Sequence, residues 1–190
     1  TKDEKIANNI LKLRVEYQDK VEDGEVKLLE ELDGEYLQKD FLSDIKNEKE
    51  YPEGLDDTPD VMVIAGSHTD KEIAEEVANL LEEMKIEYKL DYISPIRETK
   101  EFEEYMNKRA NTKLFIAISG LSALVAGSVV ALSEKPVIGV PCSNKLDGQD
   151  ALLTMANMPP GVPIGTVGID NGRNAAIVAA EVLSISDKKI

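Results

Sequence analysis

The chain has 190 residues, of which 42% are hydrophobic, enough for one domain with a substantial core and an appendage. Its 37 acidic and 22 basic residues give a net charge of −15, which disfavours nucleic acid and anionic membranes as partners. One cysteine excludes an internal disulfide, and one histidine excludes a Cys/His metal cluster. Nothing resembles a signal peptide or a membrane-spanning run, so we expect a cytoplasmic protein.

The first part of the chain is much more acidic than the rest. Residues 1–60 carry 19 acidic and 9 basic side chains, whereas the remaining 130 residues carry 18 and 13. Apolar residues recur at helical spacing from Ile6 to Tyr17, which predicts an amphipathic helix from Asp3 to about Lys20. The acidic stretch that follows is interrupted by glycine and proline. We therefore predict an N-terminal helix and acidic linker over residues 1–57 and a separate domain over residues 58–190.

The second part alternates short apolar runs with helical patterns. The sequence predicts strands at 61–65, 87–93, 114–118, 136–140 and 162–167. It predicts helices that end near Met84 and at 100–110, 121–132, 150–158 and 174–183. Five consecutive strand–helix units predict an α/β fold, a doubly wound parallel sheet with right-handed crossovers.

The run from Leu114 to Ile118 has the continuous apolar character of a central strand covered on both faces. It ends at Ser119-Gly120, and the sequence predicts that the chain turns there directly into a helix of small residues. This arrangement would expose backbone N–H groups at the carboxyl end of the strand, where ligands bind in open α/β sheets. Small residues would equally allow tight packing in a crowded core, so this stretch alone leaves both interpretations open.

Polar side chains follow the other strands at the same edge of the sheet. The first loop reads GSHTD and offers the hydroxyl of Ser67 and the carboxylate of Asp70, although ordinary helix capping by Thr69 and Asp70 is favoured for this loop alone. The second loop supplies Ser94 and Arg97, and an arginine there can bind phosphate through two hydrogen bonds.

The fourth and fifth loops add further groups at this edge. The fourth contains Cys142 and Lys145, and the fifth forms a tight turn at residues 168–172 before the last helix. Each loop is a weak signal by itself. Their convergence on one edge predicts a pocket for a small phosphorylated ligand.

Several motifs in fixed order resemble the PurE proteins of purine biosynthesis over residues 61–183. They are GSHTD, SPIR, FIAISGLSA, KPVIGVP, LDGQDALL and MPPGVPIGTVGIDNGRNAA. The resemblance implies a flavodoxin-like three-layer sandwich with a five-stranded parallel sheet, assembled as an octamer-like homo-oligomer without a metal or organic cofactor. It also implies transfer of a carboxylate to carbon four of aminoimidazole ribonucleotide, either from N5-carboxyaminoimidazole ribonucleotide or directly from carbon dioxide.

The same resemblance implies roles for six residues of the predicted pocket. Ser67 and Asp70 would bind the ribose-phosphate part of the ligand, and Ser94 and Arg97 the phosphate. The backbone of Ser119 and Gly120 would bind the base.

Two departures from the family pattern concern catalysis. The family's SAHR motif is SPIR here, with Ile96 in place of the histidine that acts as general acid and base, and Leu124 replaces the histidine of the family's AAHLPG motif. Aliphatic side chains cannot transfer a proton, and a positioned acid–base group typically contributes ~10²–10⁴-fold in rate. We therefore expect a binding site without catalytic residues. His68 is the one remaining histidine, and an exposed loop position is favoured over a substitute catalyst.

The first helix resembles the C-terminal helix of a PurE domain, and some archaeal members carry two such domains in tandem. We therefore expect this chain to be the second domain of a tandem protein. Three functions stay open: a PurE-type carboxylase or mutase, an inactive partner domain that completes the assembly, and a related carboxylase acting on a nicotinate-type ring. MPPGVP favours PurE over the third, and Ser119 disfavours a phospho-receiver domain, which needs an aspartate there.

Overall fold

The computed structural model of the protein describes residues 58–186. The helix and acidic linker that the sequence predicts within residues 1–57 lie outside the described residues. From Thr58 onward, the structure alternates strands with helices, as the apolar pattern predicts.

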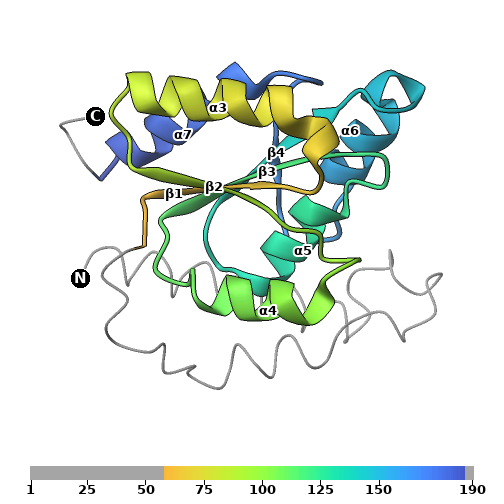
Figure 1. The fold of residues 1–190 in the computed structure, drawn as a ribbon, viewed down its shortest axis with the longest axis horizontal. Helices are drawn as coiled ribbons and strands as arrows, with labels where there is room; N and C mark the ends of the chain where they lie inside the picture. The colour runs from red at the N-terminus through yellow and green to blue at the C-terminus, as the bar shows by residue number, and fades with distance from the viewer. Residues whose placement is uncertain (1–57, 187–190) are drawn as a thin grey trace, which may run out of the picture. The chain divides into compact units, whose positions relative to one another are not determined.

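Five strands form one parallel sheet in the order β2-β1-β3-β4-β5, which confirms the flavodoxin-like α/β fold (Figure 1). The strands are β1 (Val61–Ala65), β2 (Tyr88–Tyr92), β3 (Leu114–Gly120), β4 (Val137–Cys142) and β5 (Gly165–Thr166). The helices are α3 (Lys71–Glu83), α4 (Thr99–Asn107), α5 (Leu124–Leu132), α6 (Gln149–Ala156) and α7 (Gly172–Ser184). Two short 3₁₀ helices, η2 (His68–Asp70) and η3 (Leu146–Gly148), precede α3 and α6.

The sheet is covered on both faces, because alternate residues of its strands point to opposite sides. Val61, Val63 and Ala65 of β1 pack with α3 and α7 in one core cluster. Met62 and Ile64 pack on the other face with α4, α5 and α6. Figure 1 shows α3 and α7 on one side of the strands and α4 and α5 on the other. This burial on both faces explains why β1 and β3 are continuous apolar runs rather than alternating ones.

Two boundaries differ from the sequence prediction at the edge that was expected to hold the ligand. β3 does not end before Ser119 but pairs with β4 through Ser119↔Pro141 and Gly120↔Cys142. The chain also does not turn directly into a helix, since α5 begins only at Leu124. Residues Leu121 and Ala123 lie between them with left-handed backbone, at φ values of +56° and +48°. The expected bare helix N-terminus at Gly120 is therefore wrong.

The predicted strand at 162–167 is reduced to the two residues of β5, which pair with Ile138 and Gly139 of β4. Pro163 has no N–H to donate to a ladder, and short strands are typical of sheet edges. The prediction of a fifth strand is confirmed, but its length is wrong.

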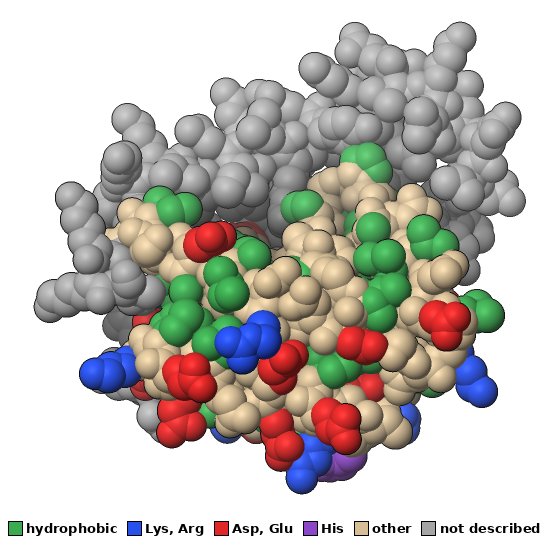
Figure 2. All heavy atoms as spheres, turned by 90° about the horizontal axis from the view of Figure 1, so that it is seen from above, with side chains coloured by type: hydrophobic (Ala, Val, Ile, Leu, Met, Phe, Trp, Pro, Cys, Tyr) green, Lys and Arg blue, Asp and Glu red, His purple; other side chains and the backbone are tan. Residues whose placement is uncertain are grey.

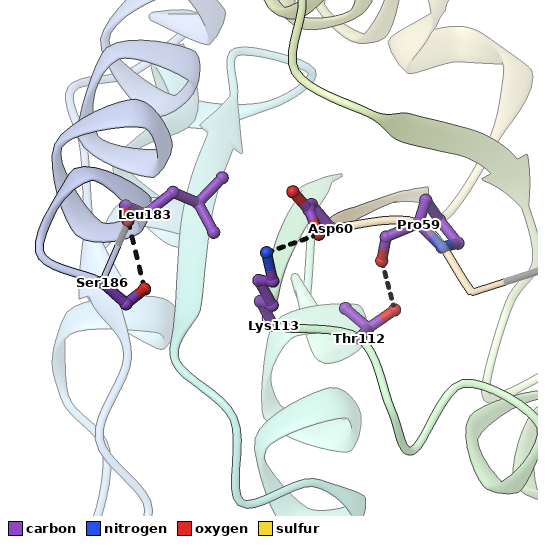
Figure 3. Close-up of polar contacts among 6 residues, drawn as sticks. All are labelled: Pro59, Asp60, Thr112, Lys113, Leu183 and Ser186. Carbon is purple, nitrogen blue, oxygen red and sulfur yellow. Dashed lines mark hydrogen bonds and ion pairs between the residues drawn. The ribbon is translucent and has the colours of Figure 1, made fainter. Parts of the chain in front are cut away.

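Side chains tie β1 and β3 together where both strands begin (Figure 3). Lys113 Nζ lies 2.8 Å from Asp60 Oδ1. The hydroxyl of Thr112 donates to the carbonyl of Pro59 at 3.2 Å. At the end of α7, Ser186 Oγ donates to the carbonyl of Leu183 at 3.2 Å. These contacts all lie away from the carboxyl edge, where the candidate site is built.

On the face that carries α3 and α7, acidic and basic side chains are interspersed rather than gathered into a patch of one sign (Figure 2). A nucleic-acid-binding surface would require a concentration of basic side chains. Within residues 58–186, no helix is both long and apolar enough to cross a bilayer.

Candidate functional site

The strand order places a topological switch point between β1 and β3 at the carboxyl edge of the sheet, and the space between the loops there is called the crevice below. The chain leaves β1 for β2 on one side and returns to β3 on the other, so the loops after β1 and β3 diverge. Ligands bind at this switch point in doubly wound folds. The loops that follow β1, β2, β3 and β4 supply the polar groups described below.

In the loop after β1, Ser67 caps the short helix η2, whereas Asp70, at the N-cap position of α3, makes no capping hydrogen bond. Ser67 Oγ accepts a hydrogen bond from the Thr69 N–H at 3.3 Å, and Asp70 makes no side-chain cap for α3. The favoured interpretation of Asp70 as a helix cap is therefore wrong. Asp70 is instead 4% exposed, and its carboxylate contacts Asn144 in the loop after β4.

Two side chains donate to the same oxygen of this buried carboxylate. Asp70 Oδ1 accepts from Thr69 Oγ1 at 3.2 Å and from Asn144 Nδ2 at 3.2 Å. Burial raises the pKa of Asp70 above its ordinary value of 3.8, although Asn144, Thr69 and the Cys142 thiol all stabilise the charged form. The carboxylate is thus held in place but carries a desolvation cost at neutral pH.

Asn144 is a site residue that the sequence analysis missed. Besides Asp70, its amide nitrogen donates to Thr69 Oγ1 at 3.4 Å. Its carboxamide also lies against Gly120, where a Cβ atom would collide with it. An isolated asparagine in a polar loop carries no motif, so only the Ser-Asn pair directly after β4 could have drawn attention to it.

Arg97 joins the loop after β2 to the loop after β1. Its Nη2 donates to the carbonyl oxygen of Gly66 at 2.6 Å, while the side chain stays exposed. A Cβ on Gly66 would lie 3.2 Å from Ser119 Oγ, so Gly66 lies next to Ser119 as well as to Arg97. The structure thus brings Arg97, the first loop and the end of β3 into one region.

Ser94 and Ser119 are buried polar residues at this edge. The Ser94 N–H donates to Glu98 Oε2 at 3.1 Å, which fixes the start of the second loop. Ser119 Oγ donates to the carbonyl oxygen of Gly120 at 3.4 Å. Both serines lie beside the loops that the sequence predicted to bind a ligand.

Exposed aliphatic side chains occupy the two positions at which the PurE motifs have histidines. Ile96 is 61% exposed and Leu124 is 45% exposed. His68 is also exposed, and its ring stacks on Tyr92 at a centroid distance of 4.2 Å. His68 therefore lies over the end of β2, on the side of β1 away from β3.

Cys142 ends β4 beside Asp70 and is buried. Burial raises the pKa of its thiol far above the ordinary value, and the nearby carboxylates of Asp70 and Asp170 raise it further. A thiol in this environment stays protonated and is a poor nucleophile. Among the described residues, no group of three or more His, Cys, Asp or Glu side chains is arranged to hold a metal ion.

A doubly wound parallel sheet with a polar crevice at its switch point defines a class of α/β proteins that bind small ligands through loop residues. Residues 60–190 match the model of the AIR carboxylase family. The chain belongs to this family, the PurE family, whose members are enzymes of purine biosynthesis.

Individual relatives agree with this assignment. The chain is 49% identical over 185 residues to a probable N5-carboxyaminoimidazole ribonucleotide mutase of Methanothermobacter thermautotrophicus, an alignment that covers 97% of this chain and 55% of the relative. It is 47% identical over 130 residues to the N5-carboxyaminoimidazole ribonucleotide mutase of Methanocaldococcus jannaschii, covering 68% of this chain and 82% of that protein. The chain therefore spans little more than half the length of the first relative.

A solved structure shows the same fold. PurE of Treponema denticola superposes with a TM-score of 0.62 at 28% identity, and the match covers 67% of this chain and 82% of that chain.

Proposed function

We propose that residues 58–190 form a PurE-type domain that binds aminoimidazole ribonucleotide in the crevice at the carboxyl edge but does not itself transfer the carboxylate. Ser67, Asp70, Ser94, Arg97, Ser119 and Gly120 form the binding site in this proposal. One observation carries it: the polar groups converge at the switch point, while Ile96 and Leu124 present exposed aliphatic side chains where the resemblance implies proton-transferring histidines.

Carboxylate transfer needs a group that both protonates and deprotonates the substrate. Neither Ile96 nor Leu124 can do so, and an apolar side chain disfavours a charged carboxylate beside it. The other side chains that could transfer a proton are poorly suited to this step, because the Cys142 thiol is buried with a raised pKa and the His68 ring stacks on Tyr92. Binding without turnover is the function that these groups support.

The full protein, in this proposal, is a cytoplasmic tandem PurE protein that places a carboxylate on imidazole carbon four. Residues 1–57 would then be the last helix of a first domain and an acidic linker. The alignment with the Methanothermobacter relative supports this arrangement, since it spans 97% of this chain and 55% of that protein. The first domain would supply the catalytic histidines.

A second candidate is an inactive partner domain that only completes an octamer-like assembly. The exposed leucines of α5 favour it, since Leu124 and Leu132 are 45% and 46% exposed on a helix whose other face packs in the core. Ligand binding distinguishes the two candidates.

Binding tests the ligand half of the proposal. We expect aminoimidazole ribonucleotide to bind the 190-residue chain, and Arg97→Ala to weaken binding by ~1.5–3 kcal/mol, the range for a hydrogen bond to a charged group. Isothermal titration calorimetry measures both. Lys108→Ala is the control, because it removes an exposed positive charge that lies after α4, away from the crevice. Absence of binding, or equal binding by Arg97→Ala, contradicts this half.

Turnover tests the catalytic half. We expect the chain to convert N5-carboxyaminoimidazole ribonucleotide no faster than the uncatalysed rate. Ile96→His alone should add little, since Pro95 alters the loop and Leu124 still fills the second position; Ile96→His with Leu124→His is the fairer test. Robust activity that His68→Ala abolishes would identify a different catalyst, and activity that survives it would indicate a different mechanism.

A further inference from the structure

Asn144 lies between the two loops to which the proposed function assigns the ligand. Its Nδ2 donates to Asp70 Oδ1 at 3.2 Å and to Thr69 Oγ1 at 3.4 Å, so this nitrogen has two acceptors in the first loop. Its carboxamide oxygen lies over Gly120, so closely that a Cβ at Gly120 would collide with it. One side chain thus spans the crevice from the loop after β1 to the end of β3.

These contacts use the same protein groups that a ribonucleotide would use. Asp70 can accept hydrogen bonds from sugar hydroxyls, and the Asn144 amide supplies equivalent donors to it. The backbone at Gly120 can lie close to a flat base because it carries no side chain, and the Asn144 carboxamide lies in that space. The ribonucleotide and the Asn144 side chain therefore cannot both contact Asp70 and Gly120 in this way.

We propose that Asn144 is an internal competitor for the ligand: its side chain occupies the crevice, and binding requires it to leave Asp70 and Gly120. This inference rests on the proposed ligand site. The inference adds Asn144, in the loop after β4, as a residue that lowers the affinity for the ligand; the proposed function assigns no binding residue to that loop.

The loop that carries Asn144 can move its side chain without disturbing the core. Residues 143–147 are exposed, whereas Cys142 before them and Gly148 after them are buried. Leu146 and Asp147 hold left-handed backbone, with φ values of +45° and +51°, which L residues adopt at a cost. The loop is held on its other side by the Ser143 N–H, which donates to Asp170 Oδ1 at 2.9 Å. Displacement of Asn144 therefore requires the loss of only its own side-chain contacts.

A competitor of this kind lowers apparent affinity by the fraction of molecules in which the crevice is open. If the side chain is out of the crevice in roughly one molecule in ten, its removal should tighten binding about tenfold. A residue that contacts the ligand favourably would give the opposite sign. The direction of the change therefore separates competition from ordinary ligand contact.

The test is calorimetric titration of the 190-residue chain with aminoimidazole ribonucleotide. We expect Asn144→Ala to bind about tenfold more tightly than the wild type. Asn144→Ser should shift in the same direction, because serine is too short to span the crevice, and it replaces the alanine variant if that variant does not fold. Asn157→Ala is the matched control: it removes the same group from an exposed position at the far end of α6, and its affinity should equal that of the wild type.

Each outcome of this titration either supports or overturns the inference. Tighter binding by either Asn144 variant supports the inference; if the wild type then shows no measurable binding, the expectation of wild-type binding fails while the proposed site stands. Wild-type binding with equal or weaker binding by the variants overturns the inference and leaves the proposed function standing. A lower unfolding free energy with unchanged affinity identifies Asn144 as a structural clamp only and overturns the inference too. Absence of binding by the wild type and by both variants overturns the inference together with the proposed function.

Discussion

Asp70 is the residue at which the loop after β1 meets the loop after β4. It is buried, it accepts hydrogen bonds from Thr69 and Asn144, and the Cys142 thiol lies beside it. Burial raises its pKa despite these donors, and Asp170 adds to the effect. An ionised carboxylate at this place therefore lowers the stability of the folded chain at neutral pH.

The sign of this effect gives a pH-dependent prediction. Because the pKa of Asp70 is higher in the folded chain than its ordinary 3.8, the folded chain keeps this proton longer than the unfolded chain. Its contribution to stability is present below pH 3.8 and is lost as the pH rises through the folded pKa. Asp70→Asn removes this titration, so we expect the variant to gain stability relative to the wild type from about pH 4 upward.

Urea unfolding of both proteins in a pH series measures this difference. Subtracting the two curves cancels the titration of all other carboxylates, since only position 70 changes. A stability difference that stays constant from pH 3 to pH 7, or that shrinks as the pH rises, contradicts the raised pKa.

The sequence could identify Asp70 but not its role. A carboxylate directly before a helix is typical of a cap, and only the fold shows that Ser67 already caps this turn. Asn144 lies 74 positions from Asp70, and no local pattern indicates that they touch. Ile96 and Leu124 could be singled out because their motifs are short and ordered, and the roles of all six predicted binding residues stay predictions.

At the scale of elements, the turn after α3 contains a lysine whose backbone has a conformation that glycine adopts more easily. Lys85 follows the helix with a left-handed φ of +58°. Its N–H donates to Glu82 O at 2.9 Å, and the N–H of Ile86 donates to Leu81 O at 2.9 Å. This is the Schellman arrangement, in which glycine is the usual residue at the left-handed position. Lysine there carries a steric cost that glycine avoids.

We therefore expect Lys85→Gly to stabilise the domain by about 1 kcal/mol, the relief of left-handed strain less the added freedom of the unfolded chain. Lys85→Ala is the control, because alanine removes the same exposed side chain but keeps the strain. Urea unfolding measures both variants. A gain that is equal in both would show that the lysine side chain, rather than its backbone, is unfavourable.

The order of strands and helices could be predicted because each strand is an apolar run between turn residues. The boundaries at β3 and β5 could not. Ser119 and Gly120 continue β3 because Pro141 and Cys142 of β4 lie opposite them, which is a long-range contact. β5 stops after two residues because it pairs only with β4 at the edge of the sheet. Tertiary pairing decides strand length in both cases.

At the scale of the molecule, α5 leaves apolar surface uncovered. Val125, Ala126, Val129 and Val130 pack in the core, yet Leu124 and Leu132 of the same helix are exposed. Exposed leucines on a helix whose valines are buried favour a contact with another protein surface. We therefore expect a symmetric homo-oligomer, octamer-like as the family resemblance implies.

Sedimentation at micromolar concentration measures this assembly, and we expect Leu132→Glu to shift it toward smaller species. Because the net charge of −15 opposes association, added salt should favour the larger species. Leu153→Glu, on a different helix, gives a comparison for the effect of a new charge alone. A wild-type mass equal to that of one chain, independent of salt, would defeat the prediction.

The position of β1 has a consequence for synthesis on the ribosome. β1 is the first strand of the described domain but lies between β2 and β3, and all five of its side chains are fully buried. The last residue of β3 is added roughly 55 residues after β1 ends, which takes about 3–11 s at typical rates of translation. During that interval, VMVIA is an uncharged, strand-forming segment that lacks at least one of its two partner strands. The edge of β1 that β3 covers in the folded domain therefore stays open to pairing with other chains until β3 emerges.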